Sequence, residues 1–286
     1  MARPDCIELG EKRDLTRIPI LYEDRSVLAV DKPAGWMLVP FTWQRTQRNL
    51  QAAISSSVAA GDFWARSRNL KFLRNIHRLD ADTTGILLFA KSHGAVQTYG
   101  DMFESRRMQK TYLAVVHGTP RQPEWTCHAP LGTDPMQPGR MIVDKKHGKE
   151  SETSFKLLAS SGKFSLVEAQ PHTGRTHQIR VHLLDSGHAV AGDDLYGPDS
   201  KIPVKLALRY EKTFPMALRA IGLMYFDPFL RKPVRIRADD TEFRKAFGFP
   251  KEAKAPAALP PAGTTPNDLK AARPGHPPAA SGKRTT

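Results

Sequence analysis

Residues 86–90, ILLFA, form an uninterrupted apolar run between Gly85 and the charged Lys91. A run of this length beside a turn signal is typical of a buried β-strand. The segment directly before it, residues 75–84, is crowded with polar groups. The sequence therefore predicts a rigid strand whose entry carries chemically active side chains.

Strand-like and helix-like segments alternate along most of the chain. Strands are expected at residues 26–35, 85–92, 110–118, 152–160, 164–171, 217–226 and 232–239, and helices at 49–60, 93–106 and 176–187. The strands outnumber the helices, and the turn at 160–163 predicts a hairpin. We therefore expect an α+β fold with a mixed, mostly antiparallel central sheet flanked by helices.

The composition excludes several classes of protein. The 286 residues are 40% hydrophobic, which is enough for one sizeable core. No run of 18 apolar residues occurs, and the first residues resemble no signal peptide, so we expect a cytoplasmic protein without membrane association. Cys6 and Cys127 form no CxxC pair, which argues against a disulfide framework and a cysteine zinc site.

The charge points to a polyanionic partner. Lys and Arg number 43 against 29 for Asp and Glu, so the net charge is +14. Nucleic acid is the leading candidate for such a basic chain. Residues 251–286 hold seven Pro and no aromatic residue, and we expect a disordered basic tail there. The expected organisation is an N-terminal extension at 1–19, a catalytic domain at 20–250 and the tail.

Asp80 and Asp82 stand just before the apolar strand. In an extended chain, residues i and i+2 share a face, so the two carboxylates could form a catalytic pair. Two carboxylates so close repel each other, and Asp82 could equally form a local turn with Thr83 and Thr84. The residues alone leave both interpretations open.

A second polar stretch, residues 170–197, contains His172, His177 and His182. Their five-residue spacing does not place them on one helix face, and HExxH is absent, so we expect no metal site. Thr176 is expected to cap the following helix. The free N–H groups at that end, together with Arg175 and Arg180, could hold a phosphate or a carboxylate such as that of Asp80.

The third stretch is residues 108–118, MQKTYLAVVHG. In a strand, Lys110 and Tyr112 face the same way, while Leu113 and Val115 face the other. Tyr112 could be a core residue. An aromatic ring beside basic residues also suits stacking on an RNA base.

These stretches, in this order, carry a resemblance. HRLDADTTGILLFAKS, KTYLAVV and TGRTHQIRVHL resemble the motifs of RluA-type RNA pseudouridine synthases, and VLAVDKPAG and GHAVAGDDLYG resemble their flanking segments. The resemblance runs from about residue 20 to residue 238. It implies the pseudouridine synthase fold and the isomerisation of uridine in rRNA or tRNA to pseudouridine, with base flipping and without cofactor or metal.

The resemblance assigns roles to individual residues. Asp80 matches the catalytic aspartate, and Arg180 matches the basic residue that pairs with it. Tyr112 matches the tyrosine that packs on the base and takes part in proton removal from C5. Arg78 matches an arginine that holds the flipped nucleotide, and Ile179 an apolar residue that lines the base pocket.

Three further residues complete the expected substrate site. His77 faces the nucleotide or braces the turn, Arg175 holds an anion, and Lys110 lies beside the stacking tyrosine. Two positions depart from the family pattern: Arg219 and Asp227 stand where the family often has histidine, which puts substrate contacts there in question. From the short N-terminal segment we expect no S4 RNA-binding domain, and we expect a monomer.

Two other functions compete with this one. A non-catalytic RNA-binding protein could keep the fold, although an intact set of Asp80, Tyr112 and Arg180 argues against it. A glycoside hydrolase could use Asp80 and Asp82, with carboxyl groups about 5–9.5 Å apart around a sugar. The sequence also leaves open whether Asp80 attacks C1′ or acts as a base at C2′.

Overall fold

The computed structural model describes residues 3–10, 15–38, 48–197 and 214–250. The chain divides into two units, Met1–Ala253 and Lys254–Thr286. All described residues belong to the first unit. The tail expected at 251–286 lies outside the described residues.

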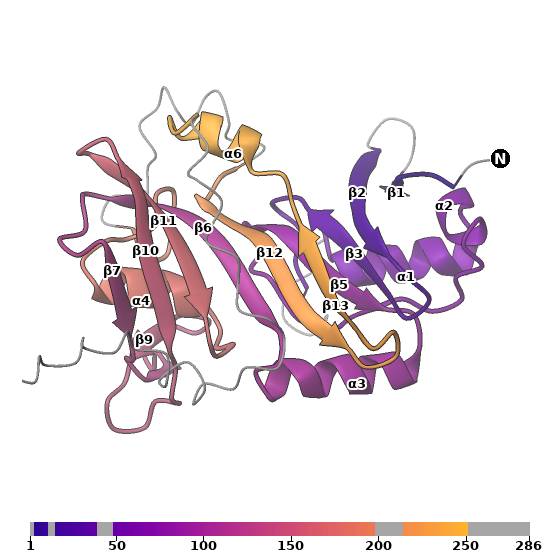
Figure 1. Ribbon diagram of the computed structural model, residues 1–286, viewed down its shortest axis with the longest axis horizontal. Coiled ribbons are helices and arrows are strands. Elements are labelled where there is room, and N and C mark those ends of the chain that lie inside the picture. Colours follow the sequence, from indigo (N-terminus) through magenta and orange to yellow (C-terminus); the bar gives the residue numbers. More distant parts are fainter. Residues whose placement is uncertain (1–2, 11–14, 39–47, 198–213, 251–286) are drawn as a thin grey trace, which may run out of the picture. The chain divides into compact units, whose positions relative to one another are not determined.

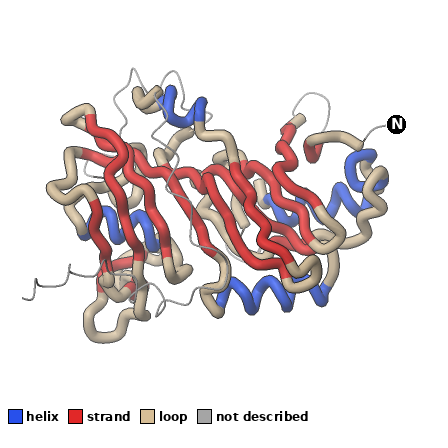
Figure 2. Tube along the Cα trace, viewed as in Figure 1, coloured by secondary structure: helices blue, strands red, loops and turns tan. Residues whose placement is uncertain are grey.

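A large sheet forms the framework of the first unit (Figures 1 and 2). Among the described residues it has 11 strands, in the order β1-β2-β3-β5-β12-β6-β11-β10-β7, with β13 beside β12 and β4 beside β5; β8 and β9 form a separate hairpin. The strands are β1 (Cys6–Leu9), β2 (Thr16–Glu23), β3 (Val27–Lys32), β4 (Arg74–Asn75), β5 (Thr84–Ala90), β6 (Gln109–His117), β7 (Glu124–Cys127), β8 (Leu131–Thr133), β9 (Met141–Val143), β10 (Thr153–Ser160), β11 (Phe164–Pro171), β12 (Leu218–Asp227) and β13 (Lys232–Arg237).

Short helices pack against this sheet. They are α1 (Leu50–Ala60), α2 (Phe63–Arg66), α3 (His93–Glu104), α4 (Gln178–Asp185) and α6 (Thr241–Ala246). Helix α1 contacts β1 and β4, α3 contacts β5, and α4 contacts β10 and β11, behind which it lies in Figure 1. No helix in the described ranges is long and apolar enough to cross a membrane.

The strand order explains why β5 is so apolar. It pairs antiparallel with β3 and parallel with β12, and all seven of its residues are buried. At Gly85 the neighbouring backbone comes so close that a Cβ would lie 2.1 Å from the carbonyl oxygen of Ala220, and φ is +105°. Only glycine fits there, so the tight entry to the strand depends on this residue.

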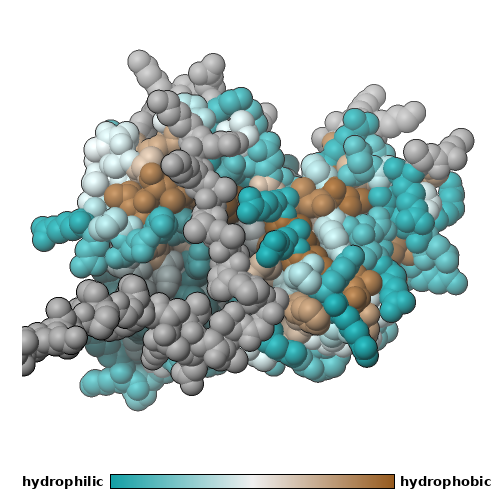
Figure 3. Space-filling model, in the orientation of Figure 1, coloured by the Kyte–Doolittle hydropathy of each residue, from teal (hydrophilic) through white to brown (hydrophobic). Residues whose placement is uncertain are grey.

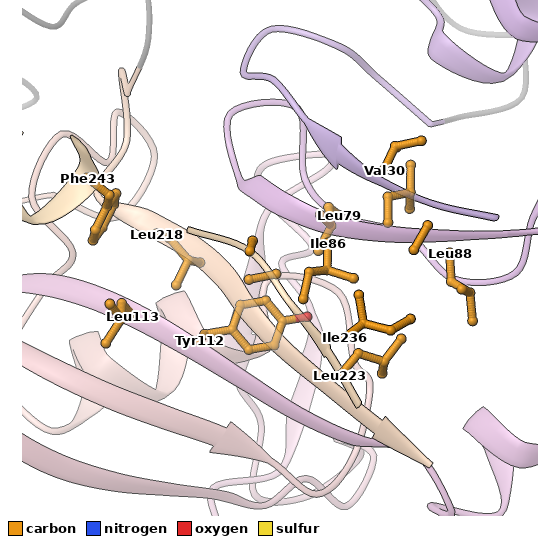
Figure 4. Close-up of a cluster of buried hydrophobic side chains, with 14 of the residues drawn as sticks. Val30, Leu79, Ile86, Leu88, Tyr112, Leu113, Leu218, Leu223, Ile236 and Phe243 are labelled. Atoms are coloured by element: carbon orange, nitrogen blue, oxygen red, sulfur yellow. The ribbon is translucent and has the colours of Figure 1, made fainter. Parts of the chain in front are cut away.

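The main core spreads along both sides of the central strands. Figure 4 shows Tyr112 of β6 among apolar side chains of β5 and β12, including Ile86 and Leu218. Hydrophilic residues cover much of the molecular face in Figure 3, with smaller apolar patches between them. A second, small cluster joins Leu131 of the β8–β9 hairpin to Val181 of α4 and to Tyr196.

The expected α+β fold is confirmed: every strand pair among the described residues is antiparallel except β5 with β12. Two details differ from the sequence-based expectations. Residues 6–9 and 16–19, assigned to an N-terminal extension, form β1 and the start of β2, so they belong to the sheet. The helix expected at 176–187 covers only Gln178–Asp185.

Candidate active site

A cleft of about 1250 Å³ opens where the polar segments meet. The first wall is the loop that enters β5, residues 75–83, together with the end of α3. The second wall is residues 173–180, which lead into α4, together with Asp194 and Leu195. Lys110 and Tyr112 of β6 line the space between the two walls. All eight site residues expected from the sequence line this cleft: His77, Arg78, Asp80, Lys110, Tyr112, Arg175, Ile179 and Arg180.

The turn that carries Asp80 is held by a buried lysine. Lys32 is fully buried at the end of β3, and its ammonium group donates to the carbonyl oxygens of Pro33, Ala81 and Thr83 at 3.1, 2.7 and 2.9 Å. Burial lowers the pKa of Lys32 to about 8. The ammonium group of Lys32 thus fixes the backbone of the Asp80 turn.

Asp80 meets its partner across the cleft. Arg180 Nη1 donates to Asp80 Oδ2 at 3.0 Å. The Asp80 side chain is 26% exposed and the Arg180 side chain only 7%. The guanidinium therefore reaches out of the protein interior to a carboxylate that stays open to a ligand. This is the pairing that the family resemblance implied.

Arg180 has a second, stronger carboxylate partner that sequence reasoning missed. Asp193 is completely buried and accepts two bonds from Arg180, at 2.6 Å from Nε and 2.7 Å from Nη2. The guanidinium also stacks on the ring of Tyr196 at 4.9 Å. The quoted segment GHAVAGDDLYG contained both residues, but nothing in its pattern linked them to Arg180. The bidentate bond leaves Nη1 as the group aimed at Asp80.

Tyr112 lies at the base of the cleft. It is buried among core side chains (Figure 4), and it shares the cleft with Lys110, as the strand alternation predicted. Burial raises the pKa of the Tyr112 phenol, and the negative charge of Asp80 raises it further. The hydroxyl is therefore protonated at neutral pH and near the carboxylate.

Lys110 is the cation closest in sequence to this tyrosine. Its ammonium group donates to the carbonyl oxygen of Thr173 at 3.1 Å, which ties β6 to the second wall. Burial lowers the pKa of Lys110 to about 8. Its charge therefore titrates just above neutral pH.

His77 has a contact that supports the turn. Its Nε2 accepts the backbone N–H of Leu88 at 3.1 Å, and its ring stacks on Phe103 at 4.6 Å. Burial, and then the charge of Lys110, lower its pKa to about 3. A neutral ring that accepts a strand N–H braces the entry to β5.

Arg78 and Arg175 are exposed at the mouth of the cleft, and Ile179 is buried on α4. The expectation that Thr176 caps this helix is wrong. His177 occupies the cap position in a left-handed conformation, with φ of 54° and no capping side-chain bond. Gln178 orders the loop instead: its side-chain oxygen accepts the N–H of Arg175 at 2.9 Å.

The remaining polar candidates occupy different places. Asp82 lines the cleft, but the carboxylate that pairs with Arg180 is that of Asp80. Arg219 and Asp227 do not line it. Arg219 is buried in a bidentate pair with Asp31, at 2.9 and 2.6 Å. Asp227 is buried and accepts the N–H groups of a turn, so these departures from the family pattern are structural features.

Comparison with known proteins gives the same assignment as the motifs. The model of the RNA pseudouridylate synthase family matches residues 26–185. A Bacillus subtilis protein named "uncharacterized RNA pseudouridine synthase YhcT" is 36% identical over 214 residues, which is 72% of this chain and 68% of that protein. The "ribosomal large subunit pseudouridine synthase C" of Escherichia coli K12 is 36% identical over 225 residues, 77% of this chain and 65% of that protein.

Solved structures agree. The human RNA pseudouridylate synthase domain containing 1 superposes with a TM-score of 0.61 at 25% identity, over 80% of this chain and 86% of that one. The human domain-containing 4 protein superposes with a TM-score of 0.63 at 21% identity and supports the fold. The chain belongs to the RNA pseudouridylate synthase family, whose members are isomerases.

Proposed function

We propose that this protein converts specific uridines of structured RNA to pseudouridine, with Asp80 as the catalytic residue. The observation that carries the proposal is the bond from Arg180 Nη1 to Asp80 Oδ2, made at 3.0 Å inside a cleft that also holds Tyr112. Family membership supplies the reaction. The geometry supplies an anionic carboxylate that is aimed, partly exposed and balanced by a cation.

The reaction needs three events. The N1–C1′ bond breaks, the uracil turns within the cleft, and C5 forms a bond to C1′. C5 then loses its proton and N1 gains one, so the product is an isomer of uridine. Asp80 serves the first event, either as a nucleophile at C1′ or as a base at C2′. Tyr112 lines the same cleft as the carboxylate and supports the base during its rotation. Its high pKa keeps the phenol neutral, so it packs on uracil without repelling Asp80.

A uridine inside a helix must leave the stack to reach Asp80. Arg78 and Arg175 at the mouth of the cleft carry the charge to grip the RNA backbone on either side of the extruded nucleotide. Ile179 offers an apolar surface to the base. The Escherichia coli relative is named for the large ribosomal subunit, so we propose large-subunit rRNA as the first substrate to test, with tRNA second.

The test is tritium release from RNA labelled at C5 of uridine. Large-subunit rRNA and tRNA transcripts are incubated separately with the wild-type protein, and modified sites are then mapped by pseudouridine-specific chemical sequencing. We expect release from the rRNA, at one or a few sites. Release from neither RNA, with retained RNA binding, would favour a binding protein that kept the fold. Release of free uracil would instead indicate glycosidic hydrolysis.

A further inference from the structure

The two carboxylate oxygens of Asp80 have different surroundings. Oδ2 accepts the bond from Arg180, whereas Oδ1 faces His177, with Nε2 at 3.9 Å. That distance exceeds a hydrogen bond, so the imidazole and the oxygen face each other across a gap. Catalytic hydrogen bonds are often long without substrate and shorten in the complex. His177 is therefore placed to act on the oxygen that Arg180 leaves free.

Tyr196 determines which nitrogen of His177 carries the proton. The Tyr196 hydroxyl accepts the backbone N–H of Met141 at 2.8 Å and lies 2.9 Å from His177 Nδ1. Tyr196 is buried, so its single O–H proton needs an acceptor, and Nδ1 lies within reach. Nδ1 then accepts, and the proton of the neutral imidazole sits on Nε2, which points at Asp80.

Packing against Tyr196 holds the imidazole of His177 in this place. Its side chain is mostly buried and lies edge-on to the Tyr196 ring, at 5.6 Å. Burial lowers the pKa of His177 although Asp80 raises it, so the ring is neutral near pH 7. His177 also adopts φ of 54°, a left-handed conformation that is uncommon for a residue with a Cβ. Such strain persists where surrounding contacts hold it, and it is common at functional sites.

We propose that His177 is a positioning residue for Asp80: its Nε2–H donates to Oδ1 when RNA is bound, and Tyr196 sets the tautomer that allows this. The inference rests on the proposed role of Asp80. With Arg180 on Oδ2 and His177 on Oδ1, the carboxylate plane is fixed on both sides. The remaining lone pairs are then directed at the nucleotide. Met141 belongs to β9, so the β8–β9 hairpin is connected to Oδ1 of Asp80 through Tyr196 and His177.

A matched pair of variants separates this role from packing. His177→Gln keeps an N–H donor near the position of Nε2, whereas His177→Met has a similar length without a donor. Both carry the same Cβ in the same backbone conformation. We expect His177→Met to slow single-turnover conversion about 100-fold, with RNA affinity within about threefold of wild type, and His177→Gln to recover most of the rate. Equal rates for the two variants would overturn the proposal.

Tyr196→Phe removes the hydroxyl alone, and Tyr225→Phe is its control. Tyr225 is also buried, and its hydroxyl has no hydrogen-bond partner among the described residues. We expect Tyr196→Phe to slow conversion about tenfold and Tyr225→Phe to leave it unchanged. Similar losses in both would mean that Tyr196 acts only through stability.

The tautomer of His177 can be measured independently of catalytic activity. Long-range ¹H–¹⁵N correlation spectra of histidine-labelled protein distinguish Nε2–H from Nδ1–H, with His177→Gln used to assign the signal. We expect the Nε2–H form in wild type and a mixture in Tyr196→Phe. A dominant Nδ1–H form in wild type would overturn the inference. If the protein released no tritium from either RNA, the proposed function would fail, whereas the spectra would still decide the tautomer.

Discussion

The two walls of the cleft are built in different ways. The wall that carries Asp80 is positioned through its backbone, because the ammonium of Lys32 binds the carbonyl oxygens of Ala81 and Thr83 beneath the turn. The wall that carries Arg180 is positioned through side chains, because Asp193 and Tyr196 hold the guanidinium from two sides. The first arrangement fixes where the carboxylate stands, and the second fixes the direction from which its counter-charge arrives.

This difference predicts how each wall fails. Loss of a backbone clamp lets a turn move while its side chains remain intact. Loss of a buried cation leaves carboxylates without a partner, which is more costly because an unpaired buried charge has few ways to be satisfied. Substitutions in the second wall should therefore cost more than substitutions in the first.

Arg180→Ala should have the largest effect, because it strands the fully buried Asp193 as well as Asp80. We expect a loss of roughly 3–5 kcal/mol in the free energy of unfolding, and loss of detectable turnover. Urea unfolding and tritium release measure the two effects. Slightly weaker RNA binding with normal turnover would show that the pairing with Asp80 is not used in catalysis.

Lys32→Met should follow. It leaves the carbonyl oxygens of Pro33, Ala81 and Thr83 without their donor, which we expect to cost about 2 kcal/mol. Turnover should fall while RNA affinity stays close to wild type, because Lys32 is buried and does not line the cleft. Lys32→Arg is a second variant that keeps the charge. If stability falls and single-turnover rates do not, the clamp supports the fold alone.

Lys110 gives a smaller effect that depends on pH. Its pKa in the folded protein is about 8, so it is mainly charged at pH 7 and mainly neutral at pH 9. Loss of that charge should weaken RNA binding about tenfold over this range at constant ionic strength. Lys110→Arg stays charged, so it should bind equally well at both values. A wild-type affinity that does not change with pH would remove Lys110 from the RNA site.

The smallest effect is expected at the rim of the cleft. Arg106, just after α3, contacts Glu150 at 3.3 Å, and both side chains are largely exposed. This pair joins the end of α3 to the segment before β10 at the protein surface, so we expect Glu150→Gln to change the free energy of unfolding by less than about 1 kcal/mol. A cost as large as that of Lys32→Met would contradict the distinction between buried and exposed links.

Local patterns predicted the central strands, whereas the family resemblance identified most of the cleft residues. The apolar run at residues 86–90 predicted β5, and strand alternation predicted that Lys110 and Tyr112 lie on one side of β6. The pairing of Asp80 with Arg180 came from family resemblance, since 100 residues separate them. No periodicity in the chain reports a contact of that range.

What remained hidden depends on tertiary structure. Nothing in the sequence distinguishes Lys32, the last residue of β3, from a surface lysine. Its burial is explained by its bonds to the carbonyl oxygens of the Asp80 turn. Asp193 lies in a loop, and nothing in the sequence of that loop predicts that its carboxylate pairs with Arg180. The start of α4 was misplaced because Thr176 is a good capping residue, whereas the left-handed backbone of His177 and the side chain of Gln178 determine where the helix begins.

Asp80→Asn tests the central claim most directly, because it keeps the shape of the side chain and removes the charge that Arg180 pairs with. The measurement is tritium release from C5-labelled RNA, beside a binding titration at fixed salt. We expect no detectable release and an RNA affinity within about tenfold of wild type, since phosphate contacts carry most of the binding. Continued release by Asp80→Asn would contradict the assignment and make Asp82 the next candidate.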